Sequence, residues 1–444
     1  MMTFAFVCVW GILLHVSWKS RDSFLFFFTA TQFVFVGLGL VLFPMLGREV
    51  LKESFSSFDF STIDNRDFEL ASITILLGVA VVVGTFFFLK VLVGRPRPKC
   101  IEPQDSFPLS TLSRTPLQLC STVAIAVCTY FIARNAGDFL SLATARSAEE
   151  MDAAVELRRD AVSDYFVTLM IYSFCPAVAI ALLQKHLSRR RFSTGLLCFT
   201  VSALAAVSLT LTFQKRPLMV FIIALWFTWR HGKNYSFSHY RRAPLLRVVF
   251  REWQAGLIFV GILFCLYYFY MGFMAADEKN SDAVATVFDI IGSRIIGRLS
   301  LPAAFYVDYF PSSHDFYWFT NSGLLAKLIG FAHFPDTQVV FAAYSSGPVE
   351  GTVAASVFTD SYGQGGLLWT PVVGVVVAAA LFVISNTASW LRPGASKLLF
   401  STFAFIFIYY LSQASLFRAL LGYGGVIYIL VWFLLVKKQF RNER

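Results

Sequence analysis

Residues 70–93 read LASITILLGVAVVVGTFFFLKVLV, an apolar run interrupted by one charged residue, Lys90. A helix of about 20 apolar residues is long enough to cross the hydrocarbon core of a bilayer. Similar runs recur along the 444-residue chain, which is 57% hydrophobic and 14% charged, whereas soluble proteins carry about 25% charged residues. This composition excludes a soluble enzyme, a nucleic-acid-binding protein and a disordered scaffold. The sequence predicts a polytopic membrane protein.

Hydropathy predicts an all-α fold with about eleven transmembrane helices. Helices are expected because backbone groups inside a bilayer must satisfy their own hydrogen bonds, and the alternating pattern of a membrane β-barrel is absent. The predicted spans are Met2–Trp18, Ser23–Leu46, Leu70–Val93, Leu117–Ile132, Tyr165–Leu183, Phe192–Phe213, Pro217–Trp229, Gln254–Phe273, Gly366–Ser385, Lys397–Ser412 and Tyr423–Val436.

The distribution of Lys and Arg predicts the orientation of these spans. No charge precedes the first span, and Lys19 and Arg21 follow it, which places the N-terminus outside and the C-terminus in the cytoplasm. The segments then assigned to the cytoplasm carry 23 of the 37 Lys and Arg residues but 5 of the 27 Asp and Glu residues. The net charge of +10 therefore reflects membrane orientation and does not call for a nucleic-acid partner.

Cysteine and histidine patterns give no support for a structural metal site or a disulfide framework. All seven cysteines fall in predicted spans or on the cytoplasmic side, and the sequence contains neither a CxxC pair nor an HExxH motif. We therefore expect free thiols and no metal ligands.

The chain forms one predicted membrane domain, residues 1–444, whose long outer segments are 47–69, 133–164 and 274–365. Long loops in a compact protein are usually functional or disordered. Residues 274–365 are rich in Phe, Tyr, Gly and Pro, so we expect an ordered segment that lies over the outer membrane surface or re-enters it. The outer face is the predicted site of function.

Two predicted helices in these segments carry candidate anion-binding arginines. A capping box at Ser147 and Glu150 predicts a helix that runs to about Asp164, with Arg146 at its N-terminus beside free backbone N–H groups. A second helix is predicted over Thr286–Leu301 and places Arg294 and Arg298 four residues apart. Neither has an acid three or four positions away, and a pair of guanidinium groups can bind phosphate oxygens. The alternative is a pair of arginines that reach the membrane interface.

Three further basic residues lie at predicted outer turns. Lys215 and Arg216 occupy the short turn before Pro217, where the positive-inside rule disfavours paired cations, and Arg418 lies before the last span. Charges at a span end that face the bundle are candidates for function. Interface anchors are the alternative interpretation.

The stretch Gly351–Gly366, GTVAASVFTDSYGQGG, supplies the candidate catalytic carboxylate. Asp360 is its one acid near the bilayer boundary, where a carboxylate is costly unless it is used. Helix packing through small residues would also explain the composition. His314 and His333 lie in the same outer segment and are candidate general bases, although a histidine in a loop is more often a surface residue.

Four short features follow one another along the chain: RNAGDF (134–139), FQKRP (213–217), RIIGRLSLP (294–302) and GTVAASVFTDSYGQGG (351–366). In this order they resemble the bacterial O-antigen polymerases (Wzy family) within the GT-C-like group of lipid-linked-sugar transferases. The resemblance covers about residues 130–385 and leaves the first 115 residues without a counterpart beyond their hydropathy.

The resemblance implies a metal-independent glycosyltransferase, without a cofactor, in the bacterial inner membrane. It would polymerise undecaprenyl-diphosphate-linked oligosaccharide units on the periplasmic face, in contact with membrane lipids and with a possible chain-length regulator protein. The lipid diphosphate and saccharide would be bound by Arg146, Lys215, Arg216, Arg294, Arg298 and Arg418, while Asp360 or His314 would act as the base. The family supplies no sharp catalytic motif, so the base remains a hypothesis from the residues.

Three alternatives stay open. An O-antigen ligase would use the same donor with a lipid A-core acceptor and would suit His314 or His333 as its base. A flippase of lipid-linked saccharides should show repeated halves and cations within its spans. An acid-dependent mannosyl- or oligosaccharyltransferase would need acidic pairs in the first outer loop, for which Asp64, Asp67 and Glu69 are candidates.

Overall fold

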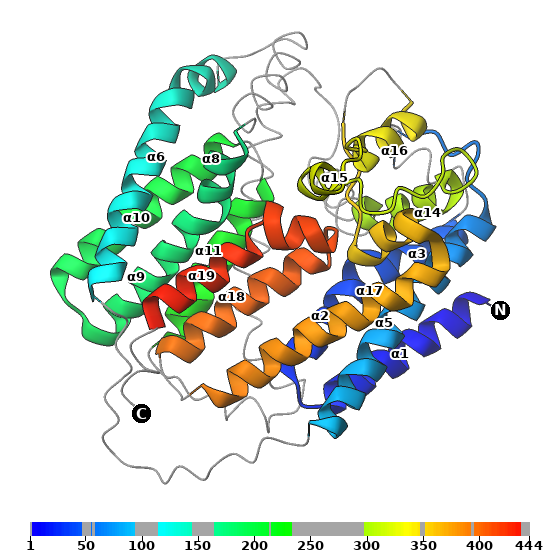
Figure 1. Ribbon diagram of the computed structural model, residues 1–444, viewed down its shortest axis with the longest axis horizontal. Coiled ribbons are helices and arrows are strands. Elements are labelled where there is room, and N and C mark those ends of the chain that lie inside the picture. Colours follow the sequence, from blue (N-terminus) through cyan, green and yellow to red (C-terminus); the bar gives the residue numbers. More distant parts are fainter. Residues whose placement is uncertain are drawn as a thin grey trace, which may run out of the picture. The chain divides into compact units, whose positions relative to one another are not determined.

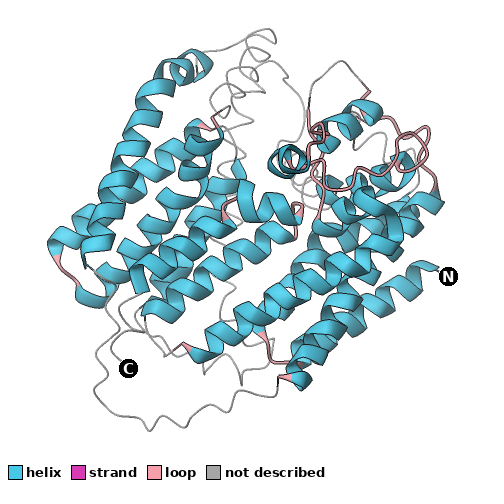
Figure 2. Ribbon diagram, viewed as in Figure 1, coloured by secondary structure: helices cyan, strands magenta, loops and turns pink. Residues whose placement is uncertain are grey.

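The computed structural model describes residues 2–46, 55, 58–93, 114–143, 164–212, 215–232, 297–346, 351–391 and 395–436. The described residues are mostly helical (Figure 2), and they contain an isolated antiparallel bridge between Phe58 and Ser345 but no strand. The predicted all-α class is confirmed for this part of the chain. The helix predicted after Ser147, the span predicted at 254–273 and the loop residues up to 296 lie outside it.

Six described helices are long and apolar enough to cross a membrane: Ser23–Met45, Asn65–Leu92, Arg114–Asn135, Tyr165–Ser188, Phe192–Leu211 and Val357–Trp390. Shorter apolar helices cover Thr3–Lys19, Ser396–Leu411 and Gly425–Leu435. These helices coincide with most of the spans predicted from hydropathy. They support a helical membrane protein, and the total of eleven spans stays a prediction.

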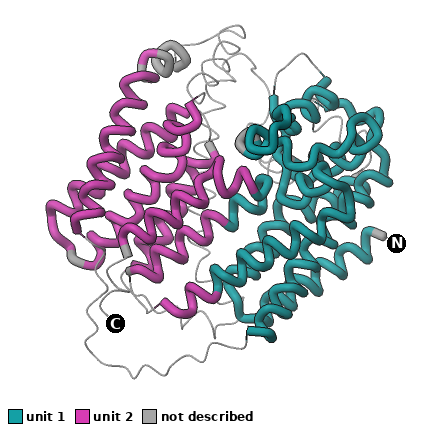
Figure 3. The backbone as a smooth tube through the Cα atoms, viewed as in Figure 1, with its two compact units in different colours: residues 1–96, 238–385, 408–416 teal, residues 97–237, 386–407, 417–444 magenta. Residues whose placement is uncertain are grey.

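The chain divides into two compact units, drawn in different colours in Figure 3. Unit 1 comprises residues 1–96, 238–385 and 408–416, and unit 2 comprises residues 97–237, 386–407 and 417–444.

The described helices of unit 1 come from both ends of its sequence and include most of α17 (Figure 1). They are α1 (Met2–Lys19), α2 (Ser23–Gln32), the π-helix η1 (Phe33–Gly37), α3 (Leu38–Leu46), α5 (Asn65–Leu92), α14 (Arg298–Tyr309), α15 (Gly323–Ile329), α16 (Asp336–Tyr344) and α17 (Val357–Trp390).

A turn at Asp22 ties together the ends of three of these helices. The Asp22 carboxylate caps α2 by accepting the N–H groups of Phe24 and Leu25, and it also accepts the Ser385 hydroxyl of α17. Lys90, near the end of α5, donates to the backbone oxygen of Ser20. At this end of unit 1, side-chain hydrogen bonds therefore supplement the apolar packing between the helices.

The π-helix η1 is stabilised by α14. A π-turn leaves backbone carbonyls without their α-helical partners. Ser300 Oγ donates to Val36 O at 2.7 Å and lies 3.4 Å from Phe35 O. Helix α14 is thus anchored to the apolar bundle, which positions the loop that follows it.

Unit 2 is built around α9 (Cys175–Arg189), which follows α8 (Tyr165–Leu169) and the π-helix η2 (Met170–Phe174). Ala177, Ala179 and Ala181 are fully buried, as expected for a central helix whose first half is apolar on all sides. Helices α6 (Arg114–Ala143), α10 (Phe192–Leu211), α11 (Lys215–Gly232) and α19 (Gly425–Val436) contact α9. Most of α18 (Ala395–Leu411) and the π-helix η4 (Arg418–Gly422) also belong to unit 2.

The structure extends two predicted elements. The span predicted at Leu117–Ile132 lies in α6, which runs on to Ala143, so the RNAGDF stretch is helical. Hydropathy locates a span but does not report where helical geometry ends. The helix end predicted at Leu301 is wrong, because residues 298–301 belong to α14, which ends at Tyr309. All five cysteines that the structure describes are free thiols.

Candidate functional site

The first eight residues of α17 form a short helix that folds back on the remainder of α17. The backbone leaves helical geometry at Gly365 (φ −166°, ψ 25°) and Gly366 (φ 70°, ψ −164°). Ser361 Oγ and Thr370 Oγ1 lie 3.2 Å apart, whereas nine residues of continuous helix would separate them by about 13 Å. Residues 357–364, which we call the half-helix, therefore reverse direction before the apolar residues that follow.

Helix α5 contacts both arms of this hairpin. The position of a Cβ on Gly78 would lie 2.4 Å from the Phe358 ring of the half-helix. A Cβ on Gly374, in the second arm, would lie 3.2 Å from the backbone oxygen of Gly78. The two arms and α5 thus pack closely, and residues 353 and 355–364 are buried. The segment before Gly365 is thus buried within the helices of unit 1, and its position relative to the membrane stays a prediction.

The loop after α14 completes the end of the half-helix. The N–H groups of Tyr317 and Trp318 donate to the carbonyls of Gly363 and Gln364, each at 3.2 Å. At the other end, Ser356 Oγ accepts the N–H of Thr359 at 3.2 Å. Both ends of a buried helix need such partners because its terminal N–H and C=O groups lack intrahelical ones.

Asp360 is 2% exposed and lies at the centre of the half-helix. Its Oδ1 accepts the Tyr317 hydroxyl at 2.9 Å and the Asn321 amide at 2.6 Å. Its Oδ2 accepts the Gln364 amide at 2.6 Å. A buried carboxylate is costly unless hydrogen bonds satisfy it, and here three neutral side chains from two segments do so. We call Asp360, Tyr317, Asn321 and Gln364 the Asp360 centre.

A second carboxylate–tyrosine pair packs against this centre. The Tyr306 hydroxyl of α14 donates to Asp336 at the start of α16, and both residues are buried. A Cβ on Gly363 would lie 2.6 Å from the Tyr317 ring and 3.0 Å from the Tyr306 ring. The glycine three residues after Asp360 is therefore required for both tyrosines to approach the half-helix.

Burial and the neighbouring charges affect Tyr317 strongly. Desolvation, followed by the charges of Asp360 and Asp336, raises the pKa of Tyr317 well above its ordinary value. The hydroxyl therefore stays protonated and donates to Asp360 over the physiological pH range.

A further tyrosine–carboxylate pair lies between α14 and α16. Tyr344 Oη donates to Asp308 Oδ2 at 2.6 Å, and Asp59 N donates to Tyr344 O at 2.8 Å. Burial and the adjacent Asp308 raise the pKa of Tyr344. The backbone hydrogen bond from Asp59 to Tyr344 therefore ties residues 47–69 to residues 274–365.

The structure places His314 in the same unit as Asp360 but separates the two by aromatic rings. His314 is exposed, its Nδ1 lies 2.6 Å from Asp315 O, and its ring packs 4.5 Å from that of Phe334. Phe334 in turn stacks on Tyr317, which binds Asp360. The other loop histidine, His333, is also exposed and lies 3.2 Å from Asn321 O through Nε2. His333 thus contacts Asn321, a partner of Asp360, directly. His314 reaches the other partner, Tyr317, only through the ring of Phe334.

The predicted cations are not assembled around Asp360 in the described part of the chain. Arg146 and Arg294 lie outside it, and Arg298 and Lys215 begin α14 and α11 with only their backbones described. Arg216 on α11 and Arg418 on η4 are partly exposed and belong to unit 2, whereas Asp360 belongs to unit 1. Within the described residues, no group of three or more His, Cys, Asp or Glu side chains is arranged to hold a metal ion.

Sequence reasoning singled out Asp360 but missed its partners. Gln364, four residues after Asp360, could have been found from the helical i, i+4 spacing. Tyr317 and Asn321 lie about forty residues away in a loop without a recognisable motif, and Tyr306 and Asp336 come from two other helices.

Comparisons with known proteins add no relative. No protein-family model matches the chain, and neither curated proteins nor solved structures give a match.

Proposed function

We propose that the protein is a membrane glycosyltransferase that polymerises polyprenyl-diphosphate-linked oligosaccharide units, in the manner of the O-antigen polymerases that it resembles. The observation that carries the proposal is the Asp360 centre, a buried carboxylate held by three neutral donors on a half-helix that re-enters the helical core. Interrupted helices at membrane depth are tolerated where protein buries them, and ionisable residues there commonly mark a substrate site. The bacterial inner membrane, with the site on the periplasmic side, is the proposed location.

In the proposed reaction, Asp360 accepts the proton of the attacking sugar hydroxyl. That oxygen forms a bond to the anomeric carbon of the donor, and the bond from this carbon to the phosphate oxygen breaks. The electron pair leaves with polyprenyl diphosphate. To reach Asp360, the hydroxyl takes the place of one neutral donor, and Tyr317, Asn321 and Gln364 orient the carboxylate beforehand.

The departing diphosphate needs cations, because its negative charge increases as the bond breaks. Arg294 and Arg298 are the proposed ligands in unit 1, where Arg298 begins the helix that contains Tyr306. Arg146, Lys215, Arg216 and Arg418 are proposed to bind the remainder of the lipid diphosphate or the saccharide. This arrangement predicts activity without a divalent metal.

One observation favours a second function, transport of a lipid-linked saccharide. Interrupted membrane helices are typical of transporter binding sites, and α17 is interrupted at Gly365–Gly366 beside a buried carboxylate. An O-antigen ligase remains the nearest enzymatic alternative.

Glycan banding in a strain from which the gene has been deleted separates these functions. Loss of a polymerase leaves lipid A-core with one repeat unit, whereas loss of a ligase leaves bare core. Loss of a flippase also leaves bare core, but lipid-linked units then accumulate on the cytoplasmic side.

A purified assay tests the chemistry directly. Full-length protein is incubated with lipid-linked units isolated from the deletion strain, with and without excess EDTA. Chain growth in both samples supports the proposal. Growth that stops in EDTA and returns with magnesium contradicts metal independence. Two results together contradict polymerisation. The chains do not grow in either sample, and the gene, returned to the deletion strain, restores single units on lipid A-core.

A further inference from the structure

We propose that α15 and its flanking loops, residues 318–331, lie in the membrane–water interface and fix the depth of the Asp360 centre. This interfacial segment is independent of the reaction proposed above. The partner that covers its exposed apolar side chains is the lipid of the bilayer.

The second arm of α17 shows where lipid is expected on unit 1. Its exposed residues Leu368, Val372, Val375 and Val383 follow helical spacing and form one apolar stripe. Leu368, at the beginning of the stripe, is 88% exposed. Such a stripe on a helix long enough to span the bilayer is the surface that lipid covers.

Aromatic contacts continue this surface onto the loop before α15. Trp369, next to Leu368, makes an edge-on ring contact with Trp318 at 5.8 Å and with Phe319 at 5.5 Å. Trp318 is 54% exposed, and both Trp318 and Phe319 have positive φ, at 40° and 68°. Bulky residues rarely adopt this conformation, so the fold holds the Trp318 ring outward at a conformational cost. Tryptophan is enriched at the membrane interface.

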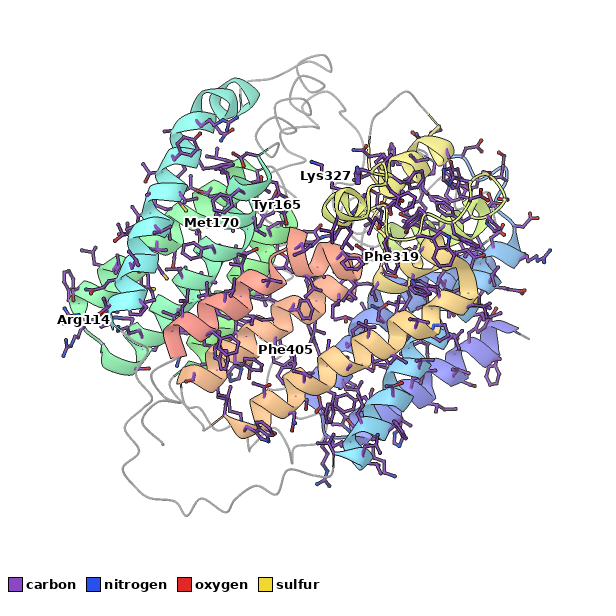
Figure 4. All side chains as sticks on the ribbon, in the orientation of Figure 1. Arg114, Tyr165, Met170, Phe319, Lys327 and Phe405 are labelled. Carbon is purple, nitrogen blue, oxygen red and sulfur yellow. The ribbon has the colours of Figure 1, made fainter. Side chains whose placement is uncertain are left out.

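Apolar exposure then extends along α15 and past its end. Leu328 is 78% exposed and Phe331 is 63% exposed, with exposed Ile329 between them. Residues 316–335 contain no Asp or Glu, and their one Lys or Arg is the exposed Lys327. Figure 4 labels Lys327 and Phe319 on this part of unit 1. An apolar surface with a long cation suits a segment lying among lipid headgroups.

The backbone of the segment is also suited to the interface. Ser322 precedes α15, and Gly330 ends it with φ 77°. The Gly330 N–H donates to Lys327 O and the Phe331 N–H donates to Ala326 O, which is the Schellman pattern. The last carbonyls of this short helix therefore have partners without relying on water.

The segment is joined directly to the site. Asn321, which donates to Asp360 at 2.6 Å, is the residue before Ser322. Trp369 Nε1 donates to Gln364 Oε1 at 3.2 Å, and Gln364 donates to Asp360. Docking of residues 318–331 at the interface thus places Asp360 at the level of the lipid headgroups.

Spin-label accessibility in full-length protein tests this placement. Labels on Leu328→Cys and Phe331→Cys are compared in nanodiscs with Val375→Cys as the lipid reference and Ser313→Cys as the aqueous reference, after replacement of reactive native cysteines. At both positions we expect the collision rate with oxygen to be higher than at Ser313→Cys. We expect the collision rate with the water-soluble nickel complex NiEDDA to be lower than at Ser313→Cys. The derived depth should fall between the two references.

Two results would overturn the proposal. If the labels at positions 328 and 331 are as accessible to the nickel complex as the label at position 313, the segment lies in water. Protection from both reagents would show that protein, such as a second copy of the chain, covers it.

A second measurement keeps the native cysteines. In vesicles whose lipids carry bromine near the headgroup, Trp318→Phe should lose part of the tryptophan quenching that the wild type shows. An unchanged quenched fraction in Trp318→Phe would also count against interfacial docking.

Discussion

The hydroxyl oxygens of Ser361 and Thr370 lie 3.2 Å apart, although the two residues are nine positions apart along α17. The contact exists because the chain reverses at Gly365 and Gly366, so the half-helix with Asp360 packs beside the apolar arm. The reversal allows the loop at Tyr317 to reach both the end of the half-helix and its carboxylate.

Asp360→Asn should abolish polymer growth while the protein still binds the lipid-linked donor. The substitution keeps the side-chain shape but removes the base. The new amide N–H₂ group at position 360 faces one of the neighbouring donors, and this mismatch should lower the free energy of unfolding by about 1–3 kcal/mol. Chain length on glycan gels and donor binding to purified protein are the measurements.

The double variant Asp360→Asn with Gln364→Glu controls for that structural cost. The new amide at position 360 can then donate to the new carboxylate at position 364, which restores the hydrogen-bonded pair while the negative charge moves by one helical turn. We expect recovered thermal stability without recovered activity. Normal chain lengths in the single variant would assign Asp360 a purely structural role.

Gly366→Ala should destabilise the protein and reduce activity. Gly366 has φ 70° and ψ −164°, a region that is essentially restricted to glycine, and a Cβ there would lie 2.9 Å from the Phe316 ring. A loss of about 1–3 kcal/mol is expected from backbone strain alone. Gly84→Ala in α5 is the matched control, because no described atom lies within 4 Å of a Cβ at that position. Thermal unfolding in detergent should separate the two variants, and equal stabilities would argue against the reversed geometry.

Stability should fall in alkaline solution partly because of Tyr317. Burial and the charges of Asp360 and Asp336 raise the pKa of Tyr317 in the folded protein, whereas in the unfolded chain it ionises near pH 10. Its contribution to stability is therefore complete below about pH 10 and is lost as the pH rises toward the folded value. Tyr317→Phe should show a shallower loss of melting temperature above pH 10 than the wild type. Identical slopes would show that the hydroxyl is not buried beside the carboxylates.

Arg294→Ala and Arg298→Ala should each remove long chains without changing the amount of protein in the membrane. Lysine at either position should restore activity only in part, since an ammonium group cannot form the paired hydrogen bonds of a guanidinium group with a diphosphate. Chain length is read on glycan gels against immunoblots of membrane protein. Full activity in both alanine variants, or full rescue by lysine, would reduce these residues to interface anchors.

The predicted orientation can be checked by labelling engineered cysteines from outside the cell. A membrane-impermeant reagent should react at a position near Asp282 and should fail near Lys233 until the membrane is opened. The opposite pattern would place the Asp360 centre on the cytoplasmic side and would contradict the proposed reaction at the outer face.

The sequence alone determined the membrane class, the helical architecture and the choice of Asp360 as a candidate. These follow from local properties: apolar runs of bilayer length predict helices, and one acid in a small-residue stretch beside a span is conspicuous. The span predicted to begin at Gly366 matches the point at which α17 leaves its reversal.

Only the tertiary structure decided what surrounds Asp360. The paired glycines at 365 and 366 permit several backbone conformations, so their local sequence does not specify a reversal. Packing of Phe358 and Gly374 against α5 selects it. That packing creates the buried environment in which Tyr317 and Asn321, from a distant loop, must donate to the carboxylate, because a buried charge without partners would be too costly.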